Sequence, residues 1–343
     1  MTSLPYFRKS WIDIARGIGL LLVLYGHVLG SDETRFFIYS FHIPLFFFLS
    51  GMVFKEAHTL SFSRFIIKNA KQILIPYILF AFLTYIYWLR IIEPTEQHNI
   101  LSDIQGIFLA NGDFPHLEFN APLWFLPCFF VTKVLYGFYL RLFNNKTMYI
   151  PLILSGITGY LFGRLLPDTQ LPFSLEIAFT TVVFFGLGHQ LRQHNTGRKV
   201  LQHKPLLLSI GLITLTYVLA FLNFTLSERQ VDTRINQFNN IFLYYSASFS
   251  GIFSVIACSY GLRKNALLEF IGKKTMVLFV WHYPLYMTIS KIIEPYKWSH
   301  EANIKVFFPF LFTIIALIVI FSFDYLWIRL RSIIAFRQTK PGK

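Results

Sequence analysis

Asp13, Arg16 and His27 are ionisable residues within the first long apolar stretch of the sequence. Arg16 and His27 are eleven positions apart, which places them on one face of an α-helix. Their separation along the helix axis is about 16 Å at a rise of about 1.5 Å per residue. Asp13 precedes Arg16 by three positions, a spacing that predicts an ion pair. A histidine can take a proton from a hydroxyl group near neutral pH, and an arginine can bind a phosphate.

The helix face between Arg16 and His27 is apolar, since Leu20 and Val23 or Leu24 occupy it. This pattern matches a ligand with an anionic head and a long, thin arm. Coenzyme A is such a molecule: its phosphates would stay at Arg16 while its pantetheine arm carries an acyl thioester towards His27. The extended arm is on the order of the same length as the stripe. The structural alternative is that Arg16 extends to the lipid headgroups and His27 only packs against other helices.

Two further groups of residues extend the pattern. His42 lies near the start of the second apolar stretch, and we expect it at the same depth as His27. Arg64, Lys68 and Lys71 follow one another at spacings of four and three before the third stretch, so they form one basic helix face. This face could bind the diphosphate and ribose phosphate of coenzyme A. The alternative is that it only fixes the topology or contacts anionic lipid.

The composition identifies the apolar stretches as membrane spans. Hydrophobic residues make up 55% of the 343 residues, charged residues 14% and aromatic residues 19%, and the mean hydropathy is +0.52. These values exclude a disordered chain, and two cysteines exclude a disulfide scaffold. We predict an all-α, polytopic membrane helix bundle that forms one domain over residues 1–343. About ten stretches are long enough to span the bilayer: residues 11–30, 36–54, 73–92, 121–142, 148–164, 173–191, 205–224, 238–262, 275–291 and 304–328.

The distribution of the 31 Lys and Arg residues predicts the orientation of the spans. Most of them lie on the side that carries both termini, including the basic tail 329–343, so we place both termini in the cytoplasm. Positive residues at the cytoplasmic side account for the net charge of +14 without a nucleic-acid partner. Asp13 and Arg16 interrupt the start of the first span, so we expect it to be retained and not cleaved as a signal peptide.

Four segments resemble motifs of the acyltransferase 3 family of integral membrane acyltransferases. Residues 11–27 contain the Asp, the Arg-Gly pair and the ten residues from Arg to His that mark the first span of the family. Residues 41–51 (FHIPLFFFLSG) and 122–127 (PLWFLP) resemble its second and fourth spans. Residues 271–275 (IGKKT), followed by WHYP at 281–284, resemble a late Gly-Lys segment and its histidine. The sugar O-acetyltransferase branch, which includes fucose 4-O-acetylases, is the nearest resemblance.

The resemblance implies a membrane O-acyltransferase in the cytoplasmic membrane of a bacterium. The donor would be cytoplasmic acyl-CoA, usually acetyl-CoA, and the acceptor a hydroxyl of an envelope or cell-surface glycan or a lipid-linked sugar. His27 is implied as the catalytic residue. At two positions where the family often has arginine this chain has Lys68 and Lys71, and lysine lacks the bidentate fork of arginine. The predicted acyl-CoA site comprises Asp13, Arg16, Arg64, Lys68 and Lys71.

Three residues are candidates for supporting roles. His42 or His282 could orient the base, polarise the thioester carbonyl or only pack, and Trp124 could line the acceptor site or anchor its helix at the membrane interface. No metal is expected, because the histidines lack compact ligand spacing and neither Cys128 nor Cys258 lies near one.

A transporter or flippase of a glycan or lipid intermediate is the main competing interpretation, and a sensor or scaffold of envelope assembly is a third. The aligned Arg16 and His27 favour an enzyme, because a transporter needs no slot of cofactor length. Transporters also tend to contain paired broken helices related by an internal repeat, and the sequence has no such repeat.

Overall fold

The computed structural model describes residues 10–28, 32–55, 60–94, 99–111, 117–193, 200–293 and 308–319, together with 321, 322, 325 and 329. Every regular element within these ranges is a helix, which confirms the predicted all-α fold. Eight helical segments in them are long and apolar enough to cross a membrane. The basic tail predicted at 329–343 lies outside the described residues except for Arg329.

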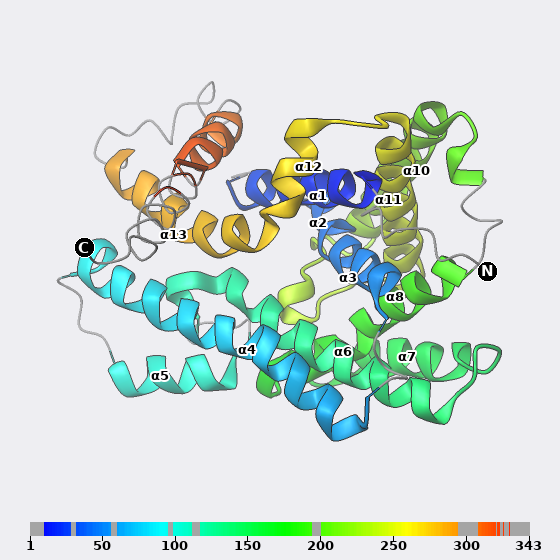
Figure 1. Cartoon of the computed structure of the whole chain (residues 1–343), viewed down its shortest axis with the longest axis horizontal. Helices are drawn as coiled ribbons and strands as arrows, with labels where there is room; N and C mark the ends of the chain where they lie inside the picture. Colours follow the sequence, from blue (N-terminus) through cyan, green and yellow to red (C-terminus); the bar gives the residue numbers. More distant parts are fainter. Residues whose placement is uncertain are drawn as a thin grey trace, which may run out of the picture.

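The eight long segments coincide with eight of the predicted spans, and Figure 1 shows their arrangement. They are α1 (Ser10–Val28), α2 with α3 (Asp32–Tyr39, His42–Val53), α4 with the π-helical turn η1 (Phe62–Tyr87, Trp88–Ile92), η2 with α6 (Glu118–Trp124, Phe125–Leu142), η3 with α8 (Pro172–Ser174, Leu175–Gln193), α10 (Pro205–Thr225), α11 (Ile241–Gly261) and α13 (Thr275–Ile293). Two shorter helices, α7 (Tyr149–Leu165) and Phe308–Val319, fall in the other two predicted spans. The remaining helices are α5 (Ile100–Leu109), η4 (Thr233–Ile235) and α12 (Ala266–Lys273).

Two boundaries differ from the predicted ones. Helix α4 begins at Phe62, before the apolar stretch predicted at 73–92, because it also includes the helix face predicted for Arg64, Lys68 and Lys71. The second span is interrupted after Tyr39, and a new helix, α3, begins at His42. Pro44 lies in the first turn of α3, where its missing N–H leaves no intrahelical hydrogen bond unmade. The interruption places His42 at the first residue of a new helix, whereas the sequence predicted it a few residues into a continuous span.

Helix α1 packs against α3, α11, α12 and α13 and lies among them in Figure 1. Glycines allow one of these contacts to be very close. The Cα of Gly17 in α1 faces the carbonyl oxygen of Leu268 in α12, and Gly272 in α12 faces the carbonyl oxygen of Asp13. A side chain at either position would overlap the backbone of the other helix. Small residues that allow such close approach are typical of helix contacts in membranes.

The contact predicts that Gly17→Ala destabilises the fold. The added methyl would collide with backbone atoms of α12, and overpacking of this kind costs about 1–3 kcal/mol. We therefore expect the apparent melting temperature of the purified protein in detergent to fall by about 2–6 °C. Gly211→Ala in α10 is the matched control, because a methyl there meets nothing within 4 Å. An unchanged melting temperature for Gly17→Ala would contradict the close contact.

Candidate active site

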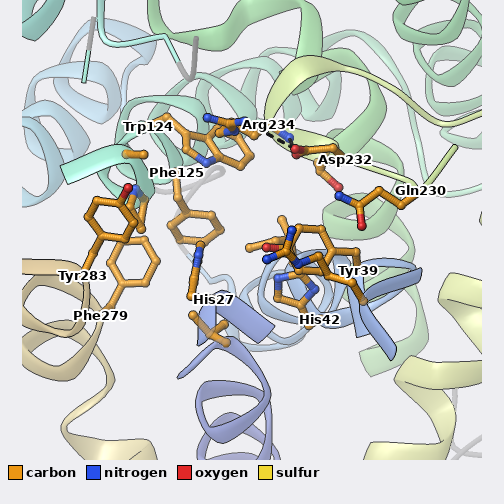
Figure 2. A pocket seen from close by; sticks show the side chains of 16 residues that line it. His27, Tyr39, His42, Trp124, Phe125, Gln230, Asp232, Arg234, Phe279 and Tyr283 are labelled. Atoms are coloured by element: carbon orange, nitrogen blue, oxygen red, sulfur yellow. Dashed lines mark hydrogen bonds and ion pairs between the residues drawn. The ribbon is translucent and has the colours of Figure 1, made fainter. Parts of the chain in front are cut away.

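A cavity of about 250 Å³ lies at the C-terminal end of α1. Its walls come from α1, the α2–α3 turn, η2, α6, the loop between α10 and α11, and α13, so segments distant in sequence meet there. Figure 2 shows the side chains that point into it. Polar and aromatic groups face each other across the cavity: His27, Tyr39, His42, Trp124, Asp232, Arg234 and Tyr283.

The structure brings four sequence-derived candidates together at this cavity. His27, His42 and Trp124 line it, which agrees with the expectation that His27 and His42 lie at one depth. His282 is fully buried beside His27, with a distance of 5.1 Å between the ring centroids. The Tyr283 ring lies 6.1 Å from that of His27. Three imidazoles from three helices are therefore grouped at one end of α1.

In two of the three imidazole rings, the Nδ1 atom is held by a hydrogen bond to a backbone carbonyl. The Nδ1–H of His42 donates to the carbonyl oxygen of Ile38 at 2.8 Å, and the Nδ1–H of His282 donates to that of Phe279 at 2.6 Å. Because a carbonyl oxygen only accepts, the neutral rings keep Nε2 as an acceptor. Among the described atoms, the buried Nε2 of His282 has no hydrogen-bond partner. Each ring thus presents a nitrogen that can accept a hydrogen bond or a proton.

Helix α13 continues through Pro284. A proline has no N–H, so the carbonyl of Val280, four residues earlier, loses its intrahelical partner. The side chain of Asn120 in η2 replaces it, because its Nδ2 donates to the carbonyl oxygen of Val280 at 3.0 Å. Asn120 is fully buried. This bond connects the segment that carries Trp124 to the helix that carries His282.

One wall of the cavity contains charged residues that the sequence analysis did not select. Arg35 lies on α2, and Asp232 and Arg234 lie in the loop before α11. An ion pair joins Arg234 to Asp232, with 3.6 Å between nitrogen and oxygen. Burial raises the pKa of Asp232, and the nearby Arg234 and Arg35 guanidinium groups partly counteract this shift.

The loop that carries Asp232 and Arg234 is held in a defined shape. The backbone groups of Asp232 and Gln237 exchange two hydrogen bonds of 2.9 Å, and the Asp232 carboxylate accepts the backbone N–H of Arg234 at 2.9 Å. The side chain of Asn236 donates to the carbonyl oxygen of Gly159 in α7 at 2.8 Å. One sequence signal could have identified Arg35 and Arg234, because cations on the predicted outer side oppose the positive-inside pattern.

The predicted donor residues lie apart from the cavity. The expected ion pair is present, with 3.8 Å between Arg16 Nη1 and Asp13 Oδ1, and Asp13 is buried while Arg16 is 25% exposed. The cavity reaches Val23 on α1 but includes neither Leu20 nor Arg16.

The other three predicted donor residues lie on the first turns of α4, and none of them lines the cavity. Arg64 and Lys71 are exposed, and Lys68 is partly exposed. The structure therefore joins His27 to His42, His282 and Trp124, but it does not join the basic face of α4 to them.

The fold and the cavity define a polytopic membrane protein with a polar cavity that histidines line. Comparison with protein families then identifies its class: the profile described as an acyltransferase domain, that of the acyltransferase 3 family, matches residues 9–326. The match covers nearly the whole chain, and the protein belongs to this family. It is a membrane acyltransferase. No curated protein and no solved structure matches the chain.

Within the described residues, no group of three or more His, Cys, Asp or Glu side chains is arranged to hold a metal ion.

The bond between Asn120 and Val280 predicts a coupled effect of two substitutions. Asn120→Ala leaves a buried carbonyl unsatisfied, which costs about 1–3 kcal/mol of unfolding free energy. Pro284→Ala restores the N–H that the carbonyl of Val280 lacks, so Asn120→Ala should cost clearly less in that background. Melting temperatures of the four proteins of this double-mutant cycle test the effect. Equal losses in both backgrounds would show that the two residues are not coupled.

Proposed function

We propose that this acyltransferase moves an acetyl group from cytoplasmic acetyl-CoA to a hydroxyl of an envelope or cell-surface glycan, or of a lipid-linked sugar, in the cytoplasmic membrane of a bacterium. The observation that carries the proposal is that α1 has an ion-paired arginine near its start and a histidine in a polar cavity at its end. The resemblance of its motifs to the sugar O-acetyltransferase branch supports a sugar hydroxyl as acceptor.

His27 is the general base in this proposal. As the acceptor oxygen attacks the thioester carbonyl carbon, the hydroxyl proton moves to the imidazole of His27. The carbon–sulfur bond then breaks, the new ester remains on the sugar, and the thiolate of coenzyme A takes the proton from the imidazolium. The step needs no further reactant. Its product is one acetyl ester and one free thiol per cycle.

The other two histidines have supporting roles in this proposal. His282, whose Nδ1–H is engaged by the backbone, faces the His27 ring and is suited to orient it. His42 keeps its Nε2 as an acceptor in the cavity wall and can hold the acceptor hydroxyl. Trp124 and Tyr283 provide aromatic faces on which a sugar ring can pack.

The donor reaches His27 along α1 in this proposal. Arg16, oriented by Asp13, binds phosphates of coenzyme A, and Arg64, Lys68 and Lys71 contribute positive charge to donor binding. The pantetheine arm follows the face of Leu20 and Val23. Leu20 is fully buried, so the arm has to displace packed side chains between Arg16 and the cavity. Membership of an acyltransferase family favours this enzyme over a transporter or flippase.

Replacing the base tests the chemistry. We expect His27→Ala to reduce acetyl transfer by about 10²–10⁴-fold, because a positioned general base contributes a rate factor of that size. The measurement is incorporation of labelled acetyl from acetyl-CoA into the glycan fraction of membranes. His203→Ala, an exposed histidine just before α10, is the control and should retain the wild-type rate. A normal rate for His27→Ala would refute the assignment.

Replacing the arginine tests donor binding. Arg16→Ala should raise the KM for acetyl-CoA by about tenfold or more, because it removes a charge-assisted bond to phosphate. S-acetylpantetheine lacks the nucleotide phosphates, so its KM should be the same for Arg16→Ala and the wild type. Lys146→Ala, an exposed cation between α6 and α7, is the control. An equal increase in KM for both donors would mean that Arg16 does not bind the phosphates.

A further inference from the structure

The cavity has two chemically different walls. Next to His27, its lining is apolar and aromatic, with Val23 and Phe279. The opposite wall carries Arg35 and Arg234, together with Gln230 and Asp232. Figure 2 shows Arg234, Asp232 and Gln230 at this side, across the cavity from Phe279 and Tyr283. The catalytic mechanism proposed above uses none of these four polar residues.

The charge of this wall is positive. Two guanidinium groups face one carboxylate, and Asp232 is the only acidic residue among the described residues that line the cavity. The ion pair between Asp232 and Arg234, at 3.6 Å, offsets one of the two guanidinium charges, which leaves the wall with a net positive charge. The Arg234 side chain is 26% exposed and lines the cavity. An anion that enters the cavity gains a favourable interaction there.

This anion does not belong to the donor. The phosphates of acyl-CoA are assigned to Arg16, which is about 16 Å along α1 from His27. Arg35 and Arg234 lie on α2 and in the loop before α11, segments that the charge distribution places on the outer side. Lys and Arg residues fix the orientation of membrane spans when they lie on the cytoplasmic side. Arg35 and Arg234 are predicted on the opposite side, so the positive-inside rule does not explain them. The acceptor is therefore the substrate whose charge meets these arginines.

We propose that Arg35 and Arg234 form an anion-binding subsite for the acceptor, so that the sugar residue that receives the acyl group carries a carboxylate or a phosphate. This inference rests on the proposed function. A guanidinium can bind either group with two parallel hydrogen bonds. A volume of about 250 Å³ lies below the roughly 300–1,000 Å³ typical of drug-sized ligands, so the cavity suits one sugar residue. With its anion at the arginines, the hydroxyls of that residue lie within the cavity that His27 lines.

A binding experiment tests the subsite without catalysis. The purified full-length protein is titrated at low salt with glucuronate, glucose 1-phosphate and glucose, which share a ring and differ in charge. We expect at least one anionic sugar to bind tenfold or more tightly than glucose, and Arg35→Gln to remove this preference. Arg234→Lys keeps the positive charge but loses the bidentate geometry of the guanidinium, so it should remove part of the preference for the anionic sugar. Arg164→Gln, an exposed arginine at the end of α7, is the control and should bind like the wild type.

A second arm identifies the natural anion. Membranes are labelled with [¹³C]acetyl-CoA, and tandem mass spectrometry locates the acetyl group that depends on His27. Its sugar residue should carry a carboxylate or a phosphate, which its mass distinguishes. A neutral acetylated residue, or equal binding of glucose and both anionic sugars, overturns the subsite. Preferential binding of an anionic sugar without any acetyl transfer that depends on His27 would support the subsite and refute the proposed function.

Discussion

The position of helix α1 is the constraint on which the rest of the site depends. A helix is stiff, so the separation between Arg16 and His27 is fixed once the helix forms. Its place in the bundle is set by the backbone contact with α12, where Gly17 and Gly272 allow each helix to touch the carbonyl of the other. Any movement of α1 shifts the arginine and the histidine together. The structure therefore couples a charged end of the bundle to a polar cavity through one rigid element.

The cavity lies where helices are interrupted or modified. The second span is broken before His42, a 3₁₀-helical segment precedes α6, and Pro284 removes a backbone hydrogen bond in α13. Non-helical backbone at membrane depth is tolerated where it lines a cavity or finds other partners. Asn120 supplies such a partner for Val280. The irregular segments thus surround a polar cavity while the bundle around them remains a regular set of apolar helices.

The sequence was sufficient for the features that depend on short-range periodicity. Apolar length predicted the spans, and the spacing of Asp13 and Arg16 predicted their ion pair. It did not predict that Arg35 and Arg234 line one cavity, because the two residues are far apart in sequence and no periodicity relates them. Hydropathy reports only the apolar part of a helix, so the part of α4 before residue 73 was indicated by the spacing of Arg64, Lys68 and Lys71 instead. Likewise, no pattern indicated that packing around Leu20 separates the cavity from Arg16.

In the proposed mechanism, one acyl-CoA molecule extends along α1 from Arg16 to His27. A structure of the protein with a non-hydrolysable acetyl-CoA analogue bound tests it most directly. The account predicts phosphate oxygens within hydrogen-bond distance of the Arg16 guanidinium. It also predicts that the acyl carbon lies in the cavity, with room for a hydroxyl between it and the His27 imidazole. An analogue bound elsewhere, or one whose acyl group ends outside the cavity, would contradict the account.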